Sequence, residues 1–391
     1  MLKKCARGPR HLSSGPIFTR LYVAEADDRL TVRPVCDKST DRRQNRRFRR
    51  RLLQKIKAPV LMPHYLIHIG PHKTGTTYLQ HSFTHLRREL AVRKICYPDR
   101  WGGPHGHHRL AIDIQSGNTG ATKLEFERLN RSDSKVILLS SETFSYFSDR
   151  DVRQLHTLLS GEKATVVFYC RRWSELIPST WREMVKHGSR STLPEVAFSC
   201  FRDPEKSDIV NFDLVLNRYA SVFGIKNLRI GSYSAVLDDV EDLLVHFCRN
   251  FLDWEDPPST GFGRVNVSLD LVDTEIIRAL NALDWIRAGD DRKPLYHRFV
   301  AEKAKFPIAA LIEQAMQYVV DTTLIDDAIF AKLHARIARR YRQAMVPPYP
   351  VAGLFVPRVA KILYVRSDYQ LFNGVIEMLR RMHVHLLHVG E

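Results

Sequence analysis

The chain has 391 residues, 44% of them hydrophobic, so it can bury a large core, and this excludes a mainly disordered protein. The six cysteines form no C-x-x-C pair, which excludes a disulfide scaffold and predicts a cytoplasmic protein without structural zinc. Of the net charge of +17, most lies in residues 1–61, which contain 17 Lys and Arg against 5 Asp and Glu, so no specific nucleic-acid binding is expected of the remainder.

The first 61 residues lack sustained hydrophobic periodicity and include the basic run Arg42–Arg51. Like charges in such a run repel, so we predict a disordered tail. Three interpretations stay open. The tail contacts a membrane surface or nucleic acid, it is an organelle-targeting segment, or it is not part of the natural protein, since Met62 directly precedes a strong strand pattern.

From Tyr65 the chain alternates short apolar runs with amphipathic segments. The predicted strands are Tyr65–Ile69, Val136–Leu139, Thr165–Tyr169 and Leu228–Tyr233. The predicted helices run from Thr76 to about Glu89, over Asp149–Leu159, from about Ser174 to Lys186, and over Val240–Leu252. This alternation predicts an α/β fold with a doubly wound, mainly parallel sheet flanked by helices.

Beyond about Asp270 the apolar spacing becomes helical, with segments near 272–286, 307–320 and 327–345. The last stretch, 346–391, has no clear pattern. We therefore predict a basic tail over 1–61, an α/β core over 62–285 and a helical extension over 286–391.

A glycine-rich loop follows the first predicted strand, with Gly70 and Gly75 in the spacing of a Walker A loop. A helix start of this kind binds anions through its free N–H groups and its dipole. A Walker A loop, however, requires lysine immediately after the second glycine. Here Thr76 occupies that position and the lysine, Lys73, lies inside the loop. The loop therefore suits a different anion from the β- and γ-phosphates of ATP.

The segment Gly-Pro-His-Lys-Thr-Gly-Thr-Thr, residues 70–77, resembles the 5′-phosphosulfate loop of sulfotransferases that use 3′-phosphoadenosine 5′-phosphosulfate (PAPS), in particular bacterial members with their P-loop-like fold. The resemblance implies a donor site formed by Gly70, Lys73, Thr74, Gly75, Thr76 and Thr77, with Lys73 also acting in catalysis. It further implies an arginine at the end of a later strand and a serine eight residues on, which together hold the 3′-phosphate. Arg171 and Ser179 have this spacing, and the neighbouring Arg172 is the alternative.

Sulfuryl transfer needs a base that accepts the proton of the acceptor. Glu142 follows the predicted strand Val136–Leu139, at the sheet edge where doubly wound folds place their sites, and is our first candidate. His107 and His108, in the cluster with His105, are the rivals. Clustered histidines also occur in metal sites, but no suitably spaced carboxylate or cysteine is nearby, so no metal is predicted and none is required.

These features predict a transferase that moves a sulfuryl group from PAPS to a hydroxyl or amine. The acceptor, for which a glycan and a lipid are two classes among several, is not specified by the sequence, and neither is the oligomeric state. A nucleotide-dependent kinase and a catalytically inactive nucleotide-binding protein of the same fold are the alternatives.

Overall fold

The computed structural model describes residues 62–102, 106–161, 163–239, 241–259, 269–283, 293–306, 319–349, 353–356, 359–365, 368 and 374–388. All of them belong to one compact unit, Leu61–Glu391. The basic segment 1–61 and His105 lie outside the described residues. Among the described helices, none has both the length and the apolar character needed to cross a membrane.

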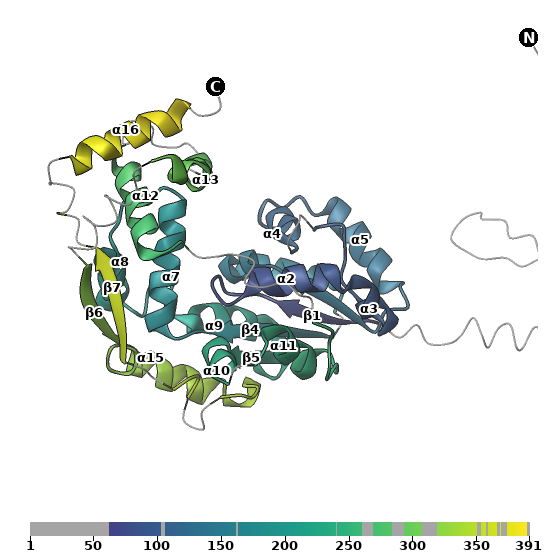
Figure 1. The fold of residues 1–391 in the computed structure, drawn as a ribbon. Coiled ribbons are helices and arrows are strands. Elements are labelled where there is room, and N and C mark those ends of the chain that lie inside the picture. Colours follow the sequence, from purple (N-terminus) through teal and green to yellow (C-terminus); the bar gives the residue numbers. More distant parts are fainter. Residues whose placement is uncertain are drawn as a thin grey trace, which may run out of the picture. The chain divides into compact units, whose positions relative to one another are not determined.

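Five parallel strands form the central sheet (Figure 1). They are β1 (His64–His68), β2 (Ile95–Cys96), β3 (Val136–Ser140), β4 (Ala164–Cys170) and β5 (Leu228–Ser232), in the order β2-β3-β1-β4-β5. The predicted doubly wound α/β fold is confirmed. Because β1 lies between β3 and β4, the segments that leave the carboxyl ends of these three strands meet at one edge.

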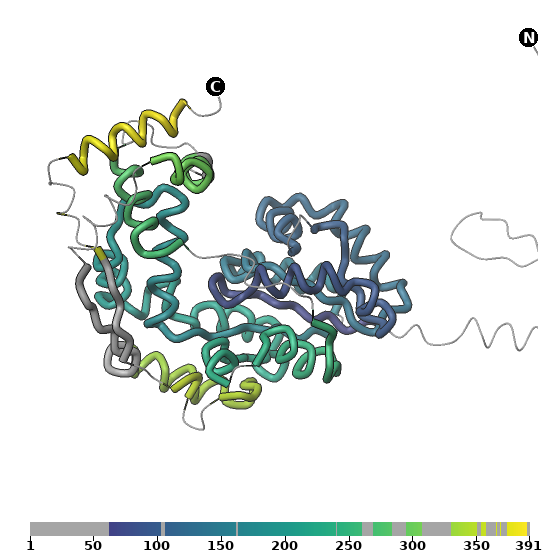
Figure 2. The backbone as a smooth tube through the Cα atoms, in the orientation of Figure 1, coloured from purple at the N-terminus to yellow at the C-terminus, as the bar shows by residue number. Residues whose placement is uncertain are grey.

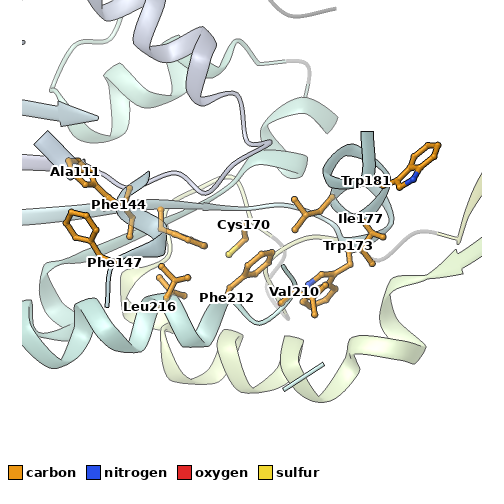
Figure 3. Packing of buried hydrophobic residues seen from close by; sticks show 14 of the residues in the cluster. Ala111, Phe144, Phe147, Cys170, Trp173, Ile177, Trp181, Val210, Phe212 and Leu216 are labelled. Atoms are coloured by element: carbon orange, nitrogen blue, oxygen red, sulfur yellow. Dashed lines mark hydrogen bonds between the residues drawn. The ribbon is translucent and has the colours of Figure 1, made fainter. Parts of the chain in front are cut away.

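Alternate residues of each strand point to opposite faces of the sheet, and both faces are buried. Leu66, Leu138 and Val167 face a cluster completed by α2 (Thr76–His85) and α11 (Leu243–Phe251). The opposite face packs on a larger cluster, part of which is drawn in Figure 3 with Phe144, Phe147 and Phe212. Its helices are α4 (His108–Gln115), α5 (Gly120–Asn130), α6 (Asp149–Leu158) and α9 (Phe212–Phe223).

One of the predicted helices is divided in the structure and another is shorter than predicted. The first ends at His85, and α3 (Arg87–Val92) begins beyond the junction residue Leu86. The segment predicted as Val240–Leu252 is preceded by α10 (Tyr233–Asp238), and α11 starts at Leu243 because Asp242 caps it by accepting hydrogen bonds from two backbone N–H groups. The other connections of the core are η1 (Glu142–Tyr146), α7 (Trp173–Lys186), α8 (Leu193–Arg202) and η2 (Ile225–Asn227).

The C-terminal extension is not wholly helical. Helix α12 (Leu271–Leu283) still belongs to the segment predicted as the core. The helical elements described beyond residue 285 are α13 (Lys293–Glu302), η3 (Lys303–Lys305), α15 (Asp326–Arg340), η4 (Arg342–Ala344) and α16 (Val375–His388). The extension also contains an antiparallel pair, β6 (Val319–Ile325) with β7 (Val359–Val365). Of the helix predicted over 307–320, residues 307–318 lie outside the described residues and Val319 and Val320 begin β6, where β-branched residues favour a strand.

The extension shares its hydrophobic core with the sheet. Helix α12 packs on α7 and α16, and Figure 2 shows these segments side by side. The ring of Trp173, at the start of α7, lies 4.7 Å from that of Phe330 in α15 and 5.2 Å from that of Phe355. The cluster under the sheet therefore continues into residues beyond 285.

Candidate functional site

The loop between β1 and α2 has the backbone geometry of an anion site. Gly70, Lys73 and Gly75 have φ angles of 86°, 68° and 75°, and Gly75 is the N-cap of α2. The Thr74 hydroxyl donates a 2.7 Å hydrogen bond to the Pro71 carbonyl, which fixes the loop internally. Such a turn directs backbone N–H groups toward a common point at the positive end of the helix dipole.

Both loop glycines have positive φ angles, which favour glycine, and both lie close to neighbouring elements. A Cβ at Gly70 would lie 3.1 Å from Cα of Glu142, so the loop lies directly against the end of β3. A Cβ at Gly75 would lie 2.4 Å from Cδ2 of Leu243 in α11. The candidate base and the anion loop are therefore neighbours. Of the two threonines that begin α2, Thr76 is buried and Thr77 is half-buried.

Lys73 is paired with a carboxylate. Its Nζ lies 2.6 Å from Oε2 of Glu183, on α7. Burial acts to raise the pKa of Glu183, but the charge and hydrogen bond of Lys73, with help from Lys186 and His187, outweigh it and lower this pKa to about 2. Sequence reasoning gave Glu183 no role, and its position one helical turn after Ser179 is the one signal that could have found it.

The two adjacent arginines at the end of β4 have different surroundings. Arg172 is 1% exposed, pairs with Asp238 and Glu175, and donates a 2.8 Å hydrogen bond to the Val356 carbonyl. Arg171 remains partly exposed. Its Nε lies 3.4 Å from Oε2 of the same Glu175, and its Nη1 lies 2.5 Å from the Lys73 carbonyl oxygen. Arg171 thus adjoins the anion loop, whereas Arg172 is enclosed by partners within the fold.

Helix α7 carries Ser179 beside two further charged groups. Ser179 is half-buried, and Arg182 and Glu183 follow within one turn. Burial and the nearby charge of Arg171 lower the pKa of Arg182, against an opposing effect of Asp270. Within the described part of the chain, Nε of Arg182 is buried without a hydrogen-bond partner. Two neighbouring guanidinium groups whose positive charge is only partly balanced by carboxylates favour a bound anion.

Glu142 is the first residue of η1, directly after β3, and its carboxylate is held in place from α2 and α4. Oε2 accepts a 2.9 Å hydrogen bond from Nε2 of Gln80 and lies 3.6 Å from Nε2 of His108. The other ring nitrogen of His108 is 2.9 Å from Oγ of Ser141. A carboxylate and an imidazole therefore stand together beside the loop.

Both ring nitrogens of His107 have partners within the fold. Its Nδ1 accepts a 3.0 Å hydrogen bond from the Ser140 backbone N–H, and its Nε2 lies 2.9 Å from the Pro98 carbonyl oxygen. Burial lowers the pKa of His107 to about 4, so the ring is neutral at pH 7. His107 has no nitrogen available for an acceptor proton. Among the described residues, no group of three or more His, Cys, Asp or Glu side chains is arranged to hold a metal ion.

A pocket of about 440 Å³ opens beside the loop. His72 and Tyr146 stand at its edge, with ring centroids 5.3 Å apart, and the charge of Glu142 acts on both side chains. Its walls are mostly apolar, with two carboxylates and one guanidinium as the charged lining groups. The remaining lining residues are Pro71, Ser145, Phe147, Ser148, Asp149, Phe168, Leu176, Thr180, Asp208, Ile209, Phe212, Val215 and Arg218.

No protein-family model and no curated protein matches the chain. Among solved structures, a sulfotransferase from Alicyclobacillus acidocaldarius matches with a TM-score of 0.33 and 14% sequence identity. The match covers 57% of this chain and 92% of that chain.

Proposed function

We propose that the protein is a PAPS-dependent sulfotransferase that transfers a sulfuryl group to a hydroxyl or amine. The observation that carries this proposal is the position of Lys73 inside the anion loop, with the carboxylate of Glu142 directly beside the loop. A lysine at this position can meet the charge that develops on the leaving phosphate, while the carboxylate on the neighbouring strand takes a proton.

In this proposal the donor anion is held by the backbone N–H groups of residues 73–77, by Lys73 and by the Thr76 and Thr77 hydroxyls. Arg171 and Ser179 hold the 3′-phosphate. The enclosed ion pairs of Arg172 favour Arg171 for this role. Arg182 adds positive charge next to Arg171, which suits the same phosphate.

Glu142 acts as the base. As the acceptor oxygen or nitrogen attacks sulfur, the bond between sulfur and the bridging phosphate oxygen breaks, and the acceptor proton passes to Glu142. The hydrogen bond from Gln80 orients the carboxylate, and the imidazole of His108 lies beside it, with Nε2 3.6 Å from Oε2 of Glu142. In-line transfer of this kind depends mainly on positioning and on charge stabilisation.

The acceptor occupies the 440 Å³ pocket beside His72 and Tyr146. Its apolar walls suit the body of an acceptor, and the edge near Glu142 suits the reacting group. The charged lining groups, Asp149, Asp208 and Arg218, then select among acceptors.

The test is transfer of radiolabelled sulfate from PAPS by the purified full chain. The acceptor panel contains a glycan, a lipid alcohol, a phenol, an aliphatic alcohol and a peptide amine, each with and without a metal chelator. We expect label on at least one class, an equal amount of 3′-phosphoadenosine 5′-phosphate (PAP), and no effect of the chelator. Phosphoryl transfer from ATP that the chelator abolishes would establish the kinase instead. Tight PAP binding without any transfer would establish an inactive nucleotide-binding protein.

A further inference from the structure

The lysine of the anion loop already has a negative partner in the protein. Lys73 is the single lysine between Gly70 and Gly75, and its Nζ lies 2.6 Å from Oε2 of Glu183. The two side chains are 24% and 35% exposed, so solvent screens this ion pair only in part. Any anion that reaches the loop therefore meets a lysine whose charge is compensated.

We infer that Glu183 competes with the anionic end of the donor for Lys73 and holds this lysine until the donor binds. The inference rests on the proposed function for the identity of the anion. A sulfate or phosphate group in contact with Lys73 would approach the carboxylate of Glu183, and two like charges at that separation repel. Binding of the anion and pairing of Glu183 with Lys73 thus oppose each other.

Glu183 is also able to release the lysine at a modest cost. Nε2 of His187 lies 3.3 Å from its Oε1, and Nζ of Lys186 lies 3.6 Å from its Oε2. Lys186 is the last residue of α7 and His187 is its C-cap, so both stay beside Glu183 when Lys73 turns toward the donor. Losing an ion-pair partner costs most free energy when the remaining charge is unpaired and fully buried. The carboxylate of Glu183 would be neither after Lys73 leaves.

Glu142, the other carboxylate beside the loop, has a different set of partners. Gln80 donates a 2.9 Å hydrogen bond to it, and Nε2 of His108 lies 3.6 Å from it, so its partners differ from those of Glu183. The two carboxylates therefore divide two tasks: Glu142 faces the acceptor proton, and Glu183 controls the charge of Lys73. Glu183 is a positioning residue in this scheme, because it acts through Lys73.

Calorimetric titration of PAP and, separately, of inorganic sulfate into the full chain tests the competition. The variants are Glu183→Gln, Lys73→Ala and the two combined, with Glu89→Gln, an exposed residue of α3, as the charge-matched control. We expect Glu183→Gln to bind both anions about threefold to tenfold more tightly, the range of a partly exposed ion pair. In the Lys73→Ala background the same change has less than about a twofold effect, as does Glu89→Gln in the otherwise unchanged chain.

Damage to the fold would weaken binding, so a gain in affinity identifies competition. Unchanged or weaker binding by Glu183→Gln overturns the inference. An equal gain with and without Lys73 overturns it as well, because Glu183 would then act on the anion directly. If PAP fails to bind the unaltered chain, the proposed function fails. The sulfate titration then decides the inference alone, and absence of any gain there overturns it.

Discussion

At the scale of single residues, neighbours in the sequence have different tasks. Arg171 and Arg172 directly follow β4, but Arg172 is enclosed by Asp238, Glu175 and the Val356 carbonyl, whereas Arg171 borders the anion loop. His107 and His108 also differ in their surroundings, since His107 is buried and His108 is one-third exposed beside Glu142.

The two arginines therefore make a matched pair of substitutions. Arg171→Ala should abolish measurable PAP binding and leave the free energy of unfolding nearly unchanged. Arg172→Ala should lower that free energy by about 2–4 kcal/mol, less than for a fully buried pair because Asp238 is 25% exposed. Urea unfolding and calorimetry on both variants check this. The assignment is wrong if Arg172→Ala is as stable as the unaltered chain and loses PAP.

Glu142→Gln keeps the shape of the side chain but removes the base. Once an acceptor is known, we expect transfer to slow by about 10²–10⁴-fold, the usual contribution of a general base, with little change in PAP affinity. His108→Asn, measured in parallel, should cost less, because His108 acts on Glu142 and does not receive the proton first. A larger loss from His108→Asn than from Glu142→Gln would reverse the two roles.

At the scale of elements, His107 joins α4 to the edge of β3. Its backbone N–H donates a 2.7 Å hydrogen bond to the Ser140 carbonyl, and its ring accepts from the Ser140 N–H. The buried ring thereby links the end of β3 to the Pro98 carbonyl, which lies 2.9 Å from its Nε2. This arrangement holds His108 and Ser141 beside the candidate base.

This junction makes stability depend on pH. In the folded protein the pKa of His107 is about 4, against about 6.5 in an unfolded chain, so the unfolded chain binds the proton first as pH falls. The free energy of unfolding should therefore fall between pH 6.5 and pH 4, by about 1.4 kcal/mol per pH unit for this histidine. In His107→Gln, the free energy of unfolding, measured with urea across this range, should change less steeply with pH, by the equivalent of about one bound proton. An unchanged slope would contradict the neutral buried ring.

At the scale of the whole molecule, the C-terminal extension completes the core. Trp173 packs on Phe330 and Phe355, and Nε2 of His246 in α11 lies 2.6 Å from the Pro347 carbonyl oxygen. At the other end of α7, Nδ2 of Asn281, in the helix α12 that precedes the extension, donates to the Val185 carbonyl. Helix α7, which carries Ser179, Arg182 and Glu183, is thus held at both ends by residues beyond the sheet.

A chain that ends at residue 285 should consequently fail to fold as a stable unit. It would expose Trp173 and leave Arg172 without the Val356 carbonyl. We expect residues 62–285 to lack a cooperative thermal transition, whereas residues 62–391 show one. Circular dichroism during heating compares the two. A cooperative transition of similar midpoint in the shorter chain would show that the extension is a separate domain.

The strands β1, β3, β4 and β5, the helices α2, α6, α7 and α11, and the position of Glu142 directly after β3 could be predicted because each depends on local pattern. Apolar alternation marks the strands, and the positions of Gly70, Lys73 and Gly75 mark the loop. The pairing of Lys73 with Glu183 joins residues 110 apart in sequence, and the contact of Arg172 with Val356 joins residues 184 apart, so no local pattern indicates either. The strand β6 was missed because its first residues, Val319 and Val320, also fit a helical spacing, and β7 was missed because it lies in the stretch 346–391, which has no clear pattern.

The most direct test of the account is calorimetric titration of the full chain with PAP, against ATP with magnesium. We predict tight binding of PAP, lost in Arg171→Ala and weakened in Lys73→Ala, with no comparable binding of ATP. Binding of ATP with magnesium, and none of PAP, would contradict the donor assignment, and the displaced lysine would then belong to a kinase.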